Sequence, residues 1–354
     1  MTRFIQIHAL TVYAPSNLNR DDTGRPKTAK FGGAERLRIS SQALKRAIRT
    51  SGAFKARVKS HHGHRTQRLG EELHQHLLSK GMSPEAAREG ARVFAAIFGK
   101  IKPEADKNPA YIEQLAFISP EERSAALGLA DRLAAGEKLP EKIDDLVPEV
   151  LRKADTATDI AMFGRMLADN PDYNREAAVQ VAHAITTHRV EVEDDFYTAV
   201  DDLKRPSEDA GAGFIGELGF GSGVFYIYAC VDRDLLERNL GGDKQLAATA
   251  IAALIDGLAT SSPTGKQASF ASRARASYLR IEKGSQQPRS LAAAFFRPVR
   301  DDDLLIASIA AIEDDSGLAA AMNKAYGPCY DAHYVMNVAG RQGSLIEAMA
   351  FAVE

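Results

Sequence analysis

Apolar and polar positions divide the chain into strand-like and helix-like segments. Residues 3–13 carry apolar side chains at near-alternate positions, and residues 224–231 (VFYIYACV) are β-branched or aromatic almost throughout. Both patterns are typical of β-strands, and residues 276–282 show a weaker strand pattern. Elsewhere apolar residues recur with the 3.6-residue period of an α-helix. The predicted helices are residues 65–80, 84–98, 109–117, 121–135, 143–153, 159–168, 175–188, 243–258, 302–313 and 317–326.

The order of these segments predicts a mixed α+β fold with two interruptions. A strand, a loop and a helix fill residues 1–60, and a strand, a helix and a strand fill residues 224–354. These segments match the two halves of a split ferredoxin-like domain, the βαββαβ fold. Residues 61–188 form a predicted helical insertion, whose last helix can also belong to the ferredoxin-like domain. Residues 189–223 are rich in acids and glycines, which predicts a β-hairpin with a turn-rich tip.

Residues 16–51 hold a polar loop, two glycines and then a short helix. The loop contains Asn19 and four cations, of which Arg20 is the first. Gly32 and Gly33 permit backbone conformations that residues with a Cβ avoid. Ser40 or its neighbour Ser41 is a suitable N-cap for the helix that follows.

That helix has one cationic face. At 100° per residue, an arc of roughly 100° collects one amide and three cations: Gln42, Lys45, Arg46 and Arg49. Alanine, leucine and isoleucine take the opposite face, which can pack on a sheet. Cations next to the unpaired amides of a helix start favour phosphate groups as partners. A solvated amphipathic helix is the alternative, but the cationic loop just upstream favours an anionic polymer.

The distribution of charge supports that choice. Residues 1–70 hold 15 Lys and Arg against 3 Asp and Glu, whereas the rest of the chain holds 30 against 44, which gives the net charge of −2. A near-neutral pI of about 6.5 therefore conceals a strongly basic N-terminal segment. Segregation of this size favours a nucleic-acid contact surface.

Several blocks of sequence occur in a characteristic order. The first block joins NLNRDDTGRPK, FGG and RLRISSQALKRA within residues 17–47. The later blocks are GRM at 164–166, AHAITTH at 182–188, FYTAVDDL at 196–203 and SGVFYIYA at 222–229. Together these blocks resemble the repeated backbone subunit of the type I-E CRISPR Cascade complex, the CasC family. The resemblance runs from near residue 1 to about residue 230 and is weaker beyond.

This resemblance implies a hand-like fold and a function. The split ferredoxin-like (RRM-related) domain would be a palm of residues 1–60 and 224–354, with helical fingers at 61–188 and a β-hairpin thumb at 189–223. The chain would be a non-catalytic subunit that polymerises head-to-tail along the CRISPR guide RNA (crRNA) as a filament in antiviral defence. Because it would hold RNA phosphates, the bases stay free to pair with target DNA. The implied partners are crRNA, target DNA, other copies of the chain and other Cascade subunits.

The resemblance also selects candidate RNA-binding residues. Those in the palm are Asn19, Arg20, Ser40, Gln42, Lys45, Arg46 and Arg49. Arg165 and Met166 match positions beside the RNA path, where a flexible apolar side chain wedges against a base. Tyr197, Thr198 and Val200 match the thumb base, which packs on a displaced nucleotide. From residue pattern alone, Arg165 would be a surface cation, and Met166 and the aromatic pair at 196–197 would be core residues.

Two other functions remain open. Related backbone subunits of type III complexes cleave target RNA with a loop aspartate, and Asp21 is the equivalent candidate for a Mg²⁺-dependent ribonuclease. The type I-E subunits that the chain resembles are not nucleases, so we expect no catalytic residue. A general single-strand RNA-binding protein is the third possibility.

We expect neither a metal nor a cofactor. The five histidines between residues 61 and 76 fit no standard metal-ligand spacing. Residues 262–267 (SPTGKQ) lack the first glycine and the Ser or Thr of a P-loop, and Lys266 can instead contact nucleic acid from a loop.

Composition places the chain among soluble globular proteins. Hydrophobic residues make up 45% and charged residues 26% of the sequence, which is ordinary for that class. No apolar run reaches the roughly 18–20 residues of a membrane helix, and the first ten residues do not resemble a signal peptide. Cys230 and Cys329 lack CxxC spacing and are expected to be reduced thiols. We therefore expect a cytoplasmic protein without membrane contact.

Overall fold

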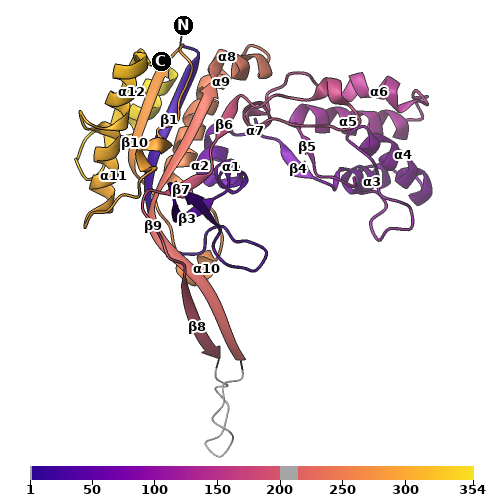
Figure 1. Ribbon diagram of the computed structural model, residues 1–354. Coiled ribbons are helices and arrows are strands. Elements are labelled where there is room, and N and C mark those ends of the chain that lie inside the picture. The colour runs from indigo at the N-terminus through magenta and orange to yellow at the C-terminus, as the bar shows by residue number, and fades with distance from the viewer. Residues whose placement is uncertain (1, 200–213) are drawn as a thin grey trace, which may run out of the picture. The chain divides into compact units, whose positions relative to one another are not determined.

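The computed structural model describes residues 2–199 and 214–354, which form two compact units (Figure 1). The first unit comprises Met1–Phe54, Val181–Cys230 and Ile251–Glu354, and the second comprises Lys55–Gln180 and Val231–Ala250. The mixed α+β class is confirmed, whereas the ferredoxin-like connectivity stays a prediction. Within the described residues, no helix has the length and apolar content to cross a bilayer.

The first unit is built on one large sheet. Its strands follow the order β11-β10-β1-β9-β7-β3-β2, and the pairs β1–β10, β10–β11, β2–β3, β3–β7 and β7–β9 are antiparallel. The strands are β1 (Phe4–Ser16), β2 (Thr28–Phe31), β3 (Ala34–Ile39), β7 (Ala184–Thr186), β9 (Phe214–Asp232), β10 (Ala276–Gly284) and β11 (Ala332–Asn337). The helices are α1 (Ser41–Thr50), α10 (Gln267–Phe270), η2 (Ala292–Phe295), α11 (Leu304–Glu313), α12 (Leu318–Tyr326) and α13 (Leu345–Val353). Helices α2 (Gly52–Val58) and α9 (Lys244–Thr260) each contribute residues to both units.

Gly32 and Gly33 form the two-residue turn between β2 and β3. Their φ angles are +59° and +74°, the left-handed pair that a type I′ hairpin turn requires. A Cβ on Gly32 would also lie 1.5 Å from the carbonyl oxygen of Phe296. The Gly-Gly pair is therefore a hairpin signal, and the segment predicted as a loop contains two short strands.

Strand β1 is buried on both of its faces because strands flank it and helices cover the sheet. Ile5, Ile7 and Leu10 are fully buried, and so are the polar side chains of Gln6 and His8 between them. One apolar layer joins Leu10 and other sheet residues to α11 through Ile309 and Ile312. Gln6 and His8 therefore need polar or charged partners inside the protein, since a buried polar group without a partner is costly.

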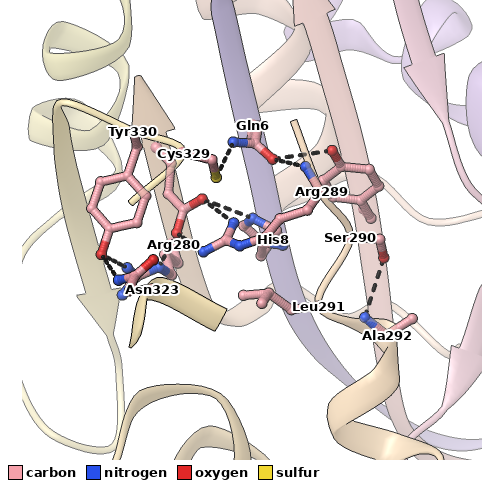
Figure 2. Close-up of polar contacts among 12 residues, drawn as sticks. Gln6, His8, Arg280, Arg289, Ser290, Leu291, Ala292, Asn323, Cys329 and Tyr330 are labelled. Atoms are coloured by element: carbon pink, nitrogen blue, oxygen red, sulfur yellow. Dashed lines mark hydrogen bonds and ion pairs between the residues drawn. The ribbon is translucent and has the colours of Figure 1, made fainter. Parts of the chain in front are cut away.

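A buried ion cluster supplies those partners (Figure 2). Glu282 accepts hydrogen bonds from Arg280 Nε at 2.7 Å and from Arg289 Nη2 at 3.1 Å, and its carboxylate lies 3.6 Å from Nε2 of His8. Arg280 also donates to both carboxylate oxygens of Glu313, at 2.9 and 2.7 Å, which ties α11 to the sheet. Two cations thus balance two carboxylates around a histidine.

The second unit is mainly helical. Its elements are β4 (His64–Thr66), α3 (Leu69–Ser79), α4 (Pro84–Ala96), β5 (Ala116–Ile118), α5 (Pro120–Ala134), α6 (Ile143–Val150), α7 (Thr158–Phe163), η1 (Pro171–Tyr173), β6 (Val179–Val181, ending at the boundary) and α8 (Arg233–Asn239). Ser83 and Ser119 cap α4 and α5, each followed by a proline in the first turn. A core that includes Leu73, Phe94 and Leu129 joins α3, α4 and α5.

Two of the helices predicted in this region are wrong. Residues 109–117 form turns that lead into β5, which pairs with β4 through Phe117 opposite Arg65. Residues 175–188 contain β6 and β7 instead of a helix. Val179 and Val181 are buried on either side of the exposed Gln180, so the period is two and the β-branched side chains favour a strand.

Candidate nucleic-acid interface

The cationic face of α1 is anchored by the apolar face behind it. Ser40 is the N-cap, and its hydroxyl accepts a hydrogen bond from the backbone N–H of Ala43 at 3.3 Å. Leu44 and Ile48 are buried, whereas Gln42 and Arg46 are exposed on the other side. Lys45 and Arg49 are half-buried. The sequence therefore predicted the N-cap and both faces of this helix correctly.

Lys45 is a cation of this face whose pKa is perturbed. Burial lowers the pKa of its ammonium group, because a partly desolvated charge is disfavoured. An anion close to Lys45 would raise this pKa again. Its attraction to the ammonium group would be strong because the local environment is only partly solvated. Such a lysine suits a phosphate site.

Asn19 fixes the loop onto the start of α1. Its side-chain oxygen accepts a hydrogen bond from the backbone N–H of Ser40 at 2.8 Å, and its carbonyl accepts one from Lys27 at the same distance. Asn17 crosses to the hairpin, where its amide donates to the carbonyl of Gly219 at 2.8 Å. Asn19 and Ser40 thus have structural hydrogen bonds in addition to their predicted RNA contacts.

The tip of the loop is an Asx turn organised by Asp21. One carboxylate oxygen of Asp21 accepts hydrogen bonds from the N–H and hydroxyl of Thr23 and from the N–H of Arg25, at 2.8–3.0 Å. The hydrogen bond from the Thr23 hydroxyl, followed by the backbone bonds, lowers the pKa of Asp21. The carboxylate that sequence reasoning named as a possible catalyst therefore shapes the loop that presents Arg20 and Arg25.

A β-hairpin rises beside this loop. It pairs β8 (Glu193–Ala199) with the first part of β9, and Tyr197 lies directly opposite Gly216. A Cβ on Gly216 would lie 2.5 Å from the Tyr197 ring, so the glycine lets the ring lie flat on its neighbour strand. Arg25 of the loop forms an ion pair with Asp194 of β8 at 2.7 Å. Loop and hairpin base are held together.

These elements enclose a pocket of about 530 Å³. Its lining is Arg20, Thr23, Gly24, Arg25, Tyr197, Glu217, Leu218, Gly219 and Lys266. Three cations can bind phosphate, and Tyr197, 44% exposed, offers a ring face on which a base can stack. The pocket joins two predicted residues, Arg20 and Tyr197. Arg25 and Glu217 were missed, and the position of Arg25 in the cationic loop was the signal that would have found it.

The second unit holds the other predicted pair. Arg165 is only 5% exposed, and its guanidinium bonds to the Glu122 carboxylate and to the carbonyl oxygens of Phe117 and Tyr173. The expectation from residue pattern that Arg165 is a surface cation is therefore wrong. Met166, next in the chain, is 79% exposed, so the expectation that it is a core residue is also wrong. Arg165 fixes the segment that presents Met166 to solvent.

The remaining predicted residues lie in or beyond the hairpin. Thr198 is exposed on β8, opposite Ile215 in the strand register. Val200 lies outside the described residues. Phe196, opposite Glu217, is 66% exposed, so this aromatic pair is not a core feature.

We expect Gly216→Ala to weaken RNA binding with little loss of stability. The three atoms nearest to the new Cβ belong to the far end of the Tyr197 side chain, so we expect the ring to swing aside and its stacking face to be lost. Base stacking is worth about 1–3 kcal/mol, so affinity should fall roughly 5- to 100-fold. Fluorescence anisotropy with labelled single-stranded RNA measures this loss. Gly128→Ala, on α5 where a Cβ meets nothing within 4 Å, is the control, and equal affinities for the two variants would contradict the role of the ring.

Comparison with known proteins identifies a family and similar solved structures. The family model described as "CT1975-like protein" matches residues 5–352. A chain in a structure titled "CRISPR RNA-guided surveillance complex, pre-nicking" is similar over 99% of both chains, with 28% identity and a TM-score of 0.81. A chain in a "CRISPR RNA-guided surveillance complex" is similar over 99% of both chains, with 25% identity and a TM-score of 0.71. None of the curated proteins matches this chain.

Proposed function

We propose that this chain, which belongs to the CT1975-like protein family, is a guide-RNA-binding backbone subunit of a Cascade-type CRISPR surveillance complex. The observation that carries the proposal is the pocket whose lining combines the cations Arg20, Arg25 and Lys266 with the ring of Tyr197. Cations and an aromatic ring bind the backbone and one base of a single strand without reading its sequence. The similarity to chains of CRISPR surveillance complexes supports the choice of guide RNA as that strand.

The proposed mechanism is non-catalytic. The cationic face of α1 and the adjacent loop hold RNA phosphates, while the hairpin packs against a displaced nucleotide. Met166, exposed between buried neighbours, is suited to wedge against a base from the second unit. The undisplaced bases stay open for pairing with target DNA, which carries the sequence specificity.

The type I-E assignment and head-to-tail assembly along the RNA belong to this proposal and rest on the sequence resemblance. A head-to-tail contact joins two different surfaces of the chain, so it continues without closing and naturally forms a filament. The other partners would be copies of the chain, the remaining Cascade subunits and target DNA.

Electrophoresis of labelled guide RNA with the purified chain and Mg²⁺, under native and denaturing conditions, tests the proposal. We expect stepwise shifted species in the native gel and intact RNA in the denaturing gel. RNA fragments at regular intervals that appear with the unaltered chain and are absent with the Asp21→Asn variant would instead show that the chain is a ribonuclease. Equal shifts for guide RNA and unrelated RNA, unchanged by the other Cascade subunits, would indicate a general RNA-binding protein.

A further inference from the structure

A second polar groove lies at the opposite end of α1 from its N-cap. It has a volume of about 720 Å³ and is formed by the end of α1, the start of α2, the end of α9 and the segment around α10. Its lining is Ala47, Thr50, Ser51, Gly52, Ala53, Thr260, Ser261, Ser262, Thr264, Gln267, Arg273, Ala274 and Arg275. These residues include two arginines and six hydroxyl groups but no carboxylate.

The two arginines give the groove its charge. Arg273 and Arg275 are both exposed, and neither forms an ion pair with a residue in the described part of the chain. Guanidinium groups bind phosphate oxygens through two parallel hydrogen bonds, so a pair of them favours a phosphate ligand. The groove is thus an anion site in electrostatic terms.

The hydroxyl groups add a second requirement for the ligand. Thr50 donates to the carbonyl of Arg46 at 2.7 Å, Thr260 to that of Asp256 at 2.6 Å, and Ser262 to that of Ala274 at 3.4 Å. Because each proton is already committed, these oxygens offer only lone pairs to a ligand. A suitable ligand therefore carries hydroxyl donors beside its phosphate, as the 2′-hydroxyl of a ribose does.

The groove also continues the cationic face of α1. Thr50 follows Arg46 by four residues, so the two lie on the same side of the helix one turn apart. An RNA backbone held by Arg46 and its neighbours would reach the groove without leaving this face.

We propose that this groove binds one ribose–phosphate unit of RNA and distinguishes RNA from DNA by the 2′-hydroxyl. The proposal rests on the proposed function, since the RNA would be the guide RNA that α1 holds. It adds Arg273 and Arg275 as phosphate ligands, and Thr50 and Thr260 as acceptors for the ribose hydroxyl.

Binding assays on the full chain test this proposal with a labelled guide RNA and a DNA of the same sequence. Arg273→Ala with Arg275→Ala should weaken the binding of both RNA and DNA. For RNA, the slope of log affinity against log salt should fall by about 1.4, at roughly 0.7 for each lost contact. Thr50→Val with Thr260→Val should leave DNA affinity unchanged and reduce RNA affinity, by about fivefold for each lost hydrogen bond.

A control variant removes the same charge elsewhere. Arg88→Ala with Lys324→Ala affects two exposed cations outside the groove, on α4 and α12. If the arginine variant equals this control while Lys45→Ala with Arg49→Ala still loses binding, the groove inference fails and the proposed function stands. If the threonine variant weakens RNA and DNA equally, discrimination by the 2′-hydroxyl is wrong. If the unaltered chain binds neither nucleic acid, both proposals fail.

Discussion

Replacement of Lys45 and Arg49 together by alanine is expected to weaken binding to single-stranded RNA of every sequence by about the same factor. A charge-assisted hydrogen bond is worth about 1.5 kcal/mol or more, so the loss of two phosphate contacts corresponds to roughly 100-fold in affinity. The slope of log affinity against log salt should fall by about 1.4, because two fewer counterions are released. Fluorescence anisotropy over a series of salt concentrations with several unrelated RNA sequences measures both quantities.

The control matches the change in net charge but places it elsewhere on the chain. Arg88→Ala with Lys324→Ala removes the same two charges from exposed positions and should change affinity by less than threefold. Circular dichroism melting should show that both double variants remain folded, since Lys45 and Arg49 lie on the polar face of α1. Loss of binding to one RNA sequence and not to others would mean that this face reads bases.

Glu282→Ala is expected to cost about 3–5 kcal/mol of the free energy of unfolding. Burial disfavours the charge of Glu282, but the neighbouring His8 ring and the hydrogen bonds from Arg289 outweigh that effect and hold its pKa below the usual range. Removal of that carboxylate leaves Arg280 with Glu313 as its carboxylate partner and takes away the carboxylate with which Arg289 forms its ion pair. A buried charge without its partner is what makes the broken pair so costly. Urea denaturation followed by circular dichroism gives the free energy.

An exposed carboxylate provides the comparison. Glu191→Ala removes a partner of Arg189 in an ion pair whose side chains are more than half exposed, and it should change stability by less than about 0.5 kcal/mol. If the two alanine variants were equally stable, the cluster in Figure 2 would be solvated in solution.

The local features of the candidate site could be predicted from the sequence because they depend on neighbours along the chain. The Ser40 cap, the apolar side of α1 and its cationic side all follow from residues within two helical turns. A hairpin is expected within residues 189–223, and β8 pairs with β9 there, although its first strand begins at Glu193 and not at Arg189. The RNA contacts assigned to these residues remain predictions.

Features that depend on distant partners could not be predicted. Arg165 carries no sign in its own sequence that Glu122 lies beside it in the core. Arg25 and Lys266, 241 positions apart, line one pocket only because Gly265 packs against the backbone of Leu18. Residues 175–188 were assigned the wrong period because a short segment of small and β-branched residues fits either pattern, and pairing with β9 decides between them.

Strand β9 runs unbroken for 19 residues, a length of about 60 Å at roughly 3.3 Å per residue, and serves both the hairpin and the large sheet (Figure 1). Near residues 225–226 it pairs with β7, and near residues 214–220 it pairs with β8. One end of β9 is therefore held within the large sheet, and the other end extends into the hairpin. A force that pushes the hairpin sideways would be resisted by the hydrogen bonds between β9 and its neighbours in the sheet. Bending of β9 would be easiest at Gly219, Gly221 and Gly223, which have no side chains. The 19-residue length of β9 therefore sets how far the described part of the hairpin extends from the large sheet.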